Sequence, residues 1–146
     1  RWGSNRAARE LSRIVADPSQ PAAVRAEAAE PLAYQYANRA IPALLMALRD
    51  PDPQLRYWAV FALGCVSHRH SERQRDPRVV PALESMLSDD AVPPAQWNSV
   101  GQEALAVLAS PLHGQPKYVE LYERELERIR RDPAAPERLR KWAHVG

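Results

Sequence analysis

The chain has 146 residues, 45% of them hydrophobic, which is enough for one compact domain or a short solenoid. Its single cysteine, Cys65, excludes a disulfide framework, and its net charge of +2 is too small to indicate a nucleic-acid-binding protein. No apolar run approaches the roughly 20 residues that span a bilayer, and no secretory leader is visible, so we expect a cytoplasmic protein with a buried, inert thiol. Because the chain begins at Arg1 rather than at Met, we expect a trimmed or processed start.

Apolar side chains recur at three- and four-residue spacing, which predicts helices, and no segment alternates for long enough to predict a strand. The expected helices cover residues 5–16, 21–36, 40–49, 54–66, 77–88, 95–109 or 99–109, 116–131 and a short segment after residue 133. Ser4 or Asn5 is placed to cap the first helix, and Pro31 must kink or shorten the second. Residues 67–76 predict an exposed basic loop, and residues 81–115 form an acidic island.

The helix expected at 116–131 has one apolar and one charged face. The apolar face carries Tyr118, Tyr122, Leu126 and Ile129. The charged face carries the supporting i,i+4 pairs Glu120–Arg124 and Glu127–Arg131. Such a helix suits the end of a repeat array, so we expect residues 116–144 to form a C-terminal cap.

An internal repeat organises these helices. AIPALLMALRD at 40–50 aligns with VVPALESMLSD at 79–89, and the helices that follow align at offsets of 31 and 45 residues. Three tandem helix pairs result, at about 5–36, 39–66 and 77–109, within a single domain that covers 1–146. Because each pair leaves an apolar face that its neighbour covers, the prediction is an all-α solenoid.

The central repeat reads A-I-P-A-L-x-x-A-L-x-D-P-D-P-x-L-R-x-x-A-x-x-A-L-G at 40–64. This pattern resembles HEAT-like repeats, in particular the short form of phycobilisome-lyase-type and many bacterial proteins, and the resemblance extends over about 17–109. It implies a right-handed α-solenoid whose second helices line the concave side.

The resemblance also implies scaffold residues. The Asp after each first helix and the Arg early in each second helix are expected to tie adjacent repeats together. By position these are Asp17 with Arg25 and Asp50 with Arg56. The third pair departs from the pattern, because it has Asp89 but carries Gly101 in place of the Arg.

Three large rings, Tyr57, Trp58 and Phe61, lie within five residues of the central second helix. The core-facing stripe of that helix is already occupied by smaller apolar residues, so at least one ring should point elsewhere. Two interpretations stay open. The rings either pack between repeats or form part of a ligand-binding surface.

The repeat offsets place carboxylates beside these rings. Glu27 and Glu103 are equivalent to Trp58, and Glu30 is equivalent to Phe61. An aromatic centre between carboxylates suits a cationic ligand through cation–π contact and ion pairing. Trp97, in a six-residue insertion of the third repeat, is a second candidate that either anchors a partner or closes the edge of the third pair.

The chain lacks recognisable catalytic or metal-binding motifs. Asp50 and Asp52 sit at a helix junction, where capping explains them better than acid–base catalysis. His68 and His70 have no further ligands at a metal-binding spacing, and the few glycines form no phosphate loop. The basic residues at 69–78 and 128–141 are interpreted as solvated faces, with a basic edge for acidic protein, nucleic acid or anionic lipid as the alternative. We therefore expect no enzyme, cofactor or metal.

The favoured function is a non-catalytic protein–protein interaction module of the adaptor, regulatory or inhibitor type. Its partner would present a basic or cationic segment to the concave second-helix surface. The alternatives are a bilin-lyase-type subunit and a nucleic-acid-binding helical-repeat protein. The second alternative is disfavoured because Glu27, Glu30 and Glu103 would repel phosphates.

Overall fold

The computed structural model describes residues 2–35, 38–68, 75–110 and 116–145, and within these ranges it contains helices and no strand. The helices are α1 (Trp2–Ala16), α2 (Ala22–Gln35), the 3-10 helix η1 (Asn38–Ala40), α3 (Ile41–Ala47), α4 (Pro53–His68), α5 (Val79–Glu84), α6 (Val100–Ala109), α7 (Pro116–Arg131) and α8 (Glu137–Val145). The predicted all-α fold class is confirmed. None of these helices is both long and apolar enough to cross a membrane.

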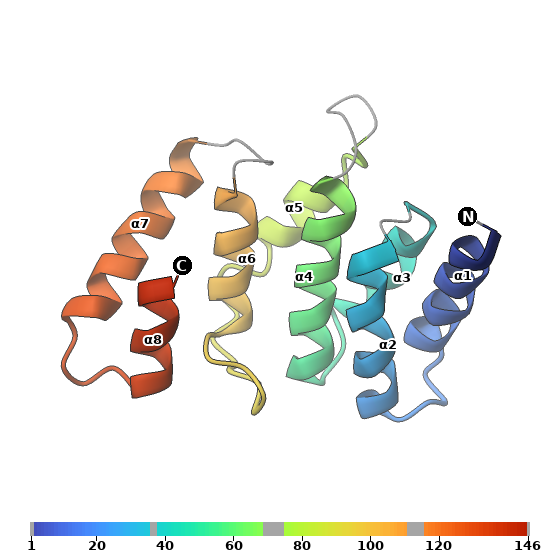
Figure 1. The fold of residues 1–146 in the computed structure, drawn as a ribbon, viewed down its shortest axis with the longest axis horizontal. Helices are drawn as coiled ribbons and strands as arrows, with labels where there is room; N and C mark the ends of the chain where they lie inside the picture. The colour runs from blue at the N-terminus through green and yellow to red at the C-terminus, as the bar shows by residue number, and fades with distance from the viewer. Residues whose placement is uncertain (1, 36–37, 69–74, 111–115, 146) are drawn as a thin grey trace.

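The helices stack in two layers (Figure 1). The second helices of the three pairs, α2, α4 and α6, stand side by side, because α4 packs against both of the others. The first helices α3 and α5 lie behind them, α1 stands beside α2 at the N-terminal end and packs against both α2 and α3, and α7 and α8 follow at the far end. The chain is thus an α-solenoid. We call its two sides the second-helix face and the first-helix face.

Several helix boundaries differ from those expected. The helix α1 begins at Trp2, so Ser4 and Asn5 lie inside it and the predicted N-cap is wrong. The helix α2 continues through Pro31 to Gln35. The helix α6 begins at Val100, because the Ser99 hydroxyl accepts the amide of Gln102 at 3.0 Å while the Gln102 side chain accepts the amide of Ser99 at 2.8 Å.

The helix α5 is only six residues long and ends at Glu84, well before the expected residue 88. Beyond it the chain tightens into turns, with the amide of Asp89 donating to the carbonyl of Met86 at 3.0 Å. The Ser85 hydroxyl also donates to the carbonyl of Ala82 at 2.6 Å, which competes with continued helix. The short helix brings residues 87–89 close to the start of α6.

The apolar interior has two parts. The main core runs through α1 to α6 and reaches Tyr118 of α7, and it includes Leu32, Leu44, Leu63, Leu83 and Leu108, all fully buried. A smaller cluster in the cap contains Leu126, Ile129, Ala135 and Ala143. The half-buried Tyr122 packs against both clusters and so joins the cap to the solenoid. The predicted ion pairs Glu120–Arg124 and Glu127–Arg131 are confirmed on the outer face of α7.

Candidate functional site

Two arginines tie successive helix pairs together. Arg25, in α2, forms an ion pair with Asp50 of the second pair. Arg56, in α4, binds Asp89 of the third pair through two nitrogens, with Nε 2.8 Å and Nη2 3.3 Å from its carboxylate oxygens. Each arginine therefore reaches forward to the next repeat. The positional pairing of Asp17 with Arg25 and of Asp50 with Arg56 is replaced by this forward pairing, although Arg56 also donates to the carbonyl of Asp50 at 2.9 Å.

We call these residues, Asp17, Arg25, Asp50, Arg56 and Asp89, the ladder. The carboxylates of the ladder also fix the turns that carry them. One oxygen of Asp17, Asp50 and Asp89 accepts the amide two residues ahead, at 3.0, 2.9 and 3.2 Å respectively. Burial by itself would raise the pKa of Asp50, but the amide of Asp52 and the guanidinium of Arg25 outweigh burial and lower that pKa below its ordinary range. Because Asp50 and Asp52 both serve the helix junction, they hold the scaffold together.

The third pair replaces the ladder arginine with Gly101, and the backbone there is unusually close. The amide of Gly101 donates to the carbonyl of Asp89 at 2.7 Å. A Cβ atom at this position would lie 2.5 Å from the carbonyl oxygen of Leu87 and 2.8 Å from that of Asp89. Only glycine fits this approach, which joins α6 to the turn of its own pair, whereas Arg25 and Arg56 reach the next pair.

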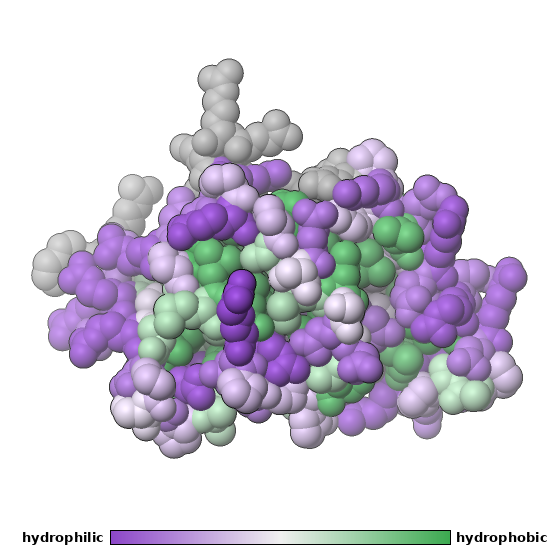
Figure 2. All heavy atoms as spheres, turned by 180° about the vertical axis from the view of Figure 1, so that it is seen from behind, coloured by the Kyte–Doolittle hydropathy of each residue, from purple (hydrophilic) through white to green (hydrophobic). Residues whose placement is uncertain are grey.

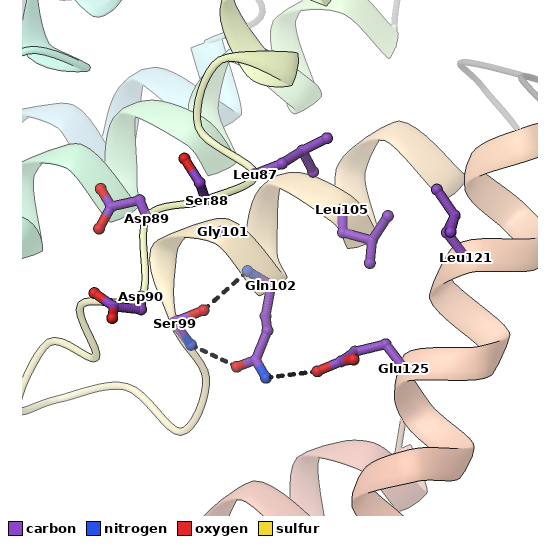
Figure 3. A pocket seen from close by; sticks show the side chains of 10 residues that line it. All are labelled: Leu87, Ser88, Asp89, Asp90, Ser99, Gly101, Gln102, Leu105, Leu121 and Glu125. Atoms are coloured by element: carbon purple, nitrogen blue, oxygen red, sulfur yellow. Dashed lines mark hydrogen bonds between the residues drawn. The ribbon is translucent and has the colours of Figure 1, made fainter.

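Beside Gly101 lies an open pocket of 410 Å³ between α6, α7 and the segment after α5 (Figure 3). Leu105 and Leu121 face each other across it, and Gln102 donates to Glu125 at 3.3 Å. Two of its three carboxylates are already paired, Asp89 with Arg56 and Glu125 with Arg128. The pocket therefore offers little uncompensated charge for a ligand. In the sequence, the signal for this pocket is Gly101, which stands where the other two repeats have an arginine.

A connected run of aromatic rings crosses from α2 to α4 on the second-helix face. Tyr34 meets Phe61 edge-on with ring centroids 6.3 Å apart, and Phe61 meets Trp58 in the same way at 5.6 Å. Tyr57 continues the run at 5.9 Å from Trp58. Phe61 and Trp58 are half-buried against the core, whereas Tyr34 is 58% exposed. The rings thus take part both in packing and in the surface.

Tyr57 and Glu103, both candidates for partner binding, belong instead to an internal network. The Tyr57 ring is buried, and its hydroxyl oxygen lies 3.0 Å from Glu103 Oε2 and 2.9 Å from Asn98 Oδ1. The Asn98 amide donates to the same Glu103 oxygen at 2.9 Å. Burial and the charge of Glu103 raise the pKa of Tyr57 well above its usual range, so the hydroxyl remains a donor. This network fixes the loop that precedes α6.

Trp97 occupies that fixed loop and is 44% exposed. Its neighbours on either side along the loop are tied down, because Asn98 is buried and the amide of Gln96 donates to the carbonyl of Pro93 at 2.9 Å. Glu27 on α2 is exposed, and Glu30 on the next turn is half-buried. The structure therefore leaves an aromatic and acidic strip, which we define as Glu27, Glu30, Tyr34, Trp58 and Phe61, with Trp97 on a separate rigid loop.

Comparison with known families identifies the scaffold. A family model described as HEAT repeats matches residues 8–109, well over half of the chain. The chain belongs to the HEAT repeat family. A comparison with curated proteins found no match. In this HEAT repeat protein the matched region runs from the middle of α1 to the end of α6, includes all of the ladder and strip residues, and stops before α7.

Other candidate residues of this HEAT repeat protein have different surroundings. Cys65 is half-buried, and burial together with the charge of Glu103 raises the pKa of its thiol, which makes it less nucleophilic. His68 ends α4, while Arg69, His70 and Arg73 lie outside the described residues. Near the C-terminus, Arg128, Arg131 and Lys141 each pair with a glutamate one turn away. That region is therefore largely neutralised.

One strip residue was missed in the sequence. Tyr34 lies near the end of α2, next to the buried residues Leu32 and Ala33. These two residues account for the apolar pattern there, so the pattern does not single out Tyr34. Its contact with Phe61 depends on how far α2 is shifted along α4, and the repeat offset alone does not give that shift. Its polar neighbour Gln35 and its position off the apolar stripe were the available signals.

Proposed function

We propose that this chain is a non-catalytic protein-interaction module that binds a basic segment of a partner protein on the second-helix face. HEAT repeats are scaffolds that generally mediate protein–protein interaction, and the chain's membership of that family supports the general role. The observation that supports the specific surface is the run of rings from Tyr34 through Phe61 to Trp58, joined on α2 by the carboxylates of Glu27 and Glu30.

The chemistry of the strip favours cations over anions. Aromatic faces attract ammonium and guanidinium groups by roughly 0.5–2 kcal/mol each, and more strongly where water is excluded. Glu27 and Glu30 add charge of the complementary sign, on the same helix as the most exposed ring. A lysine- or arginine-containing segment with apolar residues between its charges would match both parts. A phosphate backbone would be repelled.

The absence of catalysis is part of the proposal. The carboxylates at the turns that join the paired helices are those of Asp50, Asp52 and Asp89. Each of them already accepts a hydrogen bond from a backbone amide or a guanidinium group. Cys65, with its raised thiol pKa, is poorly suited to act as a nucleophile. A single unpaired thiol suits a reducing compartment, so we place this activity in the cytoplasm.

The test uses a short fluorescein-labelled peptide of lysine and leucine, with fluorescence anisotropy as the readout. Tyr34→Ala and the double variant Glu27→Gln/Glu30→Gln should each weaken binding by about tenfold, because each removes one part of the strip. The matched control is Glu120→Gln/Glu123→Gln on the exposed face of α7, which makes the same change in net charge.

Tyr34 is exposed enough that its truncation should leave the fold intact, which circular dichroism would verify. If the control weakens binding as much as the strip variants do, the attraction is a property of net charge and the proposed surface is wrong. The same conclusion follows if neither strip variant changes the affinity.

A further inference from the structure

We propose that a groove lined by arginines on the first-helix face, between α1 and α3, binds an acidic, amphipathic segment of a second partner protein. This site is formed by α1, η1 and α3, whereas the aromatic and acidic strip lies on α2 and α4, and it would attract the opposite charge. We call it the arginine groove and define it by Arg6, Arg9, Arg13, Arg39 and Met46.

The groove consists of two adjoining hollows of 380 Å³ each, which share Arg9 and Arg39. One hollow adds Arg6, and the other adds Arg13 and continues over Met46. The helix α1 supplies three of the arginines at positions three and four residues apart, which puts them on one side of the helix. The fourth, Arg39, is brought beside them by η1, which packs against α1.

Most of the positive charge of the groove is uncompensated. Glu10 is the one carboxylate among the described residues that line the two hollows, and its exposed pair with Arg13 at 3.2 Å offsets one of the four arginines. Among the described residues, Arg6, Arg9 and Arg39 have no ion pair.

The helix α7 provides an internal comparison. It is also rich in arginine, yet Arg124, Arg128 and Arg131 each pair with a glutamate one turn away. Neutralisation by i,i+3 and i,i+4 glutamates is therefore the arrangement on α7, whereas among the described residues of α1 only Arg13 has such a partner. Three arginines without such partners leave guanidinium groups free to form paired hydrogen bonds to carboxylates.

The apolar wall of the groove indicates what kind of anion fits. Ala43 and Pro42 continue the hollow beyond the arginines, and Met46 is 64% exposed. Seen from behind, hydrophilic side chains gather over the α1 end of this face, next to a hydrophobic area in the middle (Figure 2). An occupant therefore needs carboxylates at one end and apolar side chains at the other.

This combination favours an acidic peptide over other polyanions. The sugar–phosphate backbone of a nucleic-acid duplex has no apolar groups to cover Met46, and its specific binders bury far larger surfaces than two small hollows provide. A bilayer presents a flat array of headgroups, whereas a groove between two helices accepts a chain segment. A glutamate-rich amphipathic peptide meets both requirements.

The experiment titrates the whole chain with a fluorescein-labelled peptide of glutamate and leucine. We expect saturable binding that weakens as the salt concentration rises, because the contacts are exposed ion pairs. Arg9→Glu/Arg39→Glu should weaken binding by about tenfold or more, since the two residues line both hollows. The matched control is Arg49→Glu/Arg138→Glu, which changes the net charge equally at two exposed arginines outside the groove.

A Met46→Ser variant tests the apolar wall and should also weaken binding without altering charge. Tyr34→Ala should leave the affinity for this acidic probe unchanged, so failure here is distinguishable from failure of the second-helix surface. Duplex DNA and phosphatidylserine vesicles are run in parallel. The proposal is overturned if either binds more tightly than the peptide, if the peptide does not bind, or if the control reduces binding as much as the groove variant does.

Discussion

At the scale of single residues, Gly101 shows how one missing side chain lets a second helix approach the turn of its own pair. Arg25 and Arg56 occupy the equivalent positions in the first two pairs and reach the next repeat through their guanidinium groups. At Gly101 the backbone itself touches the preceding turn, with its amide 2.7 Å from the carbonyl oxygen of Asp89. The position that carries the forward ion pair in the first two pairs therefore holds a backbone contact within the third pair.

Gly101→Ala should destabilise the protein by about 1–3 kcal/mol, as measured by urea denaturation. In an ordinary helix this change would stabilise by up to about 1 kcal/mol, so the expected sign is the reverse of helix propensity. The reason is that the new Cβ would lie 2.5 Å from the carbonyl oxygen of Leu87. Because this oxygen belongs to the backbone, the clash cannot be relieved by a change of side-chain rotamer.

Gly64→Ala is the companion variant. There the new Cβ would meet the side chain of Val107 at 2.7 Å, and a side chain can shift. Gly64→Ala should therefore cost less than Gly101→Ala. Equal costs, or a more stable Gly101→Ala protein, would refute the close backbone approach.

At the scale of helices and turns, the ladder of aspartates and arginines sets the register between repeats. Arg56 donates at once to Asp89 and to the carbonyls of Asp50 and Pro51, so one side chain joins two successive turns. Because these side chains are largely shielded from water, their pairing is stronger than that of the exposed pairs on α7. The ladder should therefore contribute to stability in a pH-dependent way.

The folded state lowers the pKa of Asp50 from its ordinary value of 3.8. As the pH falls below about 4, the unfolded chain takes up the proton first, so the stability that Asp50 provides is present above 3.8 and is lost as the pH falls toward its lower folded pKa. Asp50→Asn removes this contribution. Its free energy of unfolding should be lower at neutral pH and should decline less steeply between pH values near 5 and 3.

Urea denaturation at several pH values tests this, with Glu120→Gln, from an exposed pair on α7, as the control. The control should keep the acid-dependent slope of the parent protein. A slope in Asp50→Asn that matches the parent would mean that the ladder carboxylate does not stabilise the fold.

The helices themselves were predictable because each repeat carries its own periodicity and turn residues. The candidate site was harder to predict than the helices, because it depends on where side chains point and on contacts between helices. Trp58 and Glu27 align by repeat offset, but the offset does not say that Tyr57 turns inward to Asn98. The sequence also does not show that each ladder arginine pairs with the aspartate of the next helix pair and not with that of its own. Arg39 joins the arginines of α1 through tertiary packing, which leaves no trace in local spacing.

At the scale of the whole molecule, the two layers of the solenoid present different chemistry. The second-helix face carries Tyr34, Trp58 and Phe61 with two glutamates, and the first-helix face carries the arginine groove. Because the strip and the groove share no residue and lie on different helices, a basic segment and an acidic segment could be held at the same time. A protein of this kind would act as a bridge between two partners.

The account depends most on the second-helix face, and amide NMR shift mapping tests that face directly. The protein is titrated with the lysine and leucine peptide while the resonance of each backbone amide is followed. We predict that the largest shifts fall on α2 and α4, around Glu30, Tyr34, Trp58 and Phe61, and that α5 and the outer face of α7 stay unchanged. Shifts that gather on the first-helix face or the cap, or no shifts at saturating peptide, would contradict the proposed function.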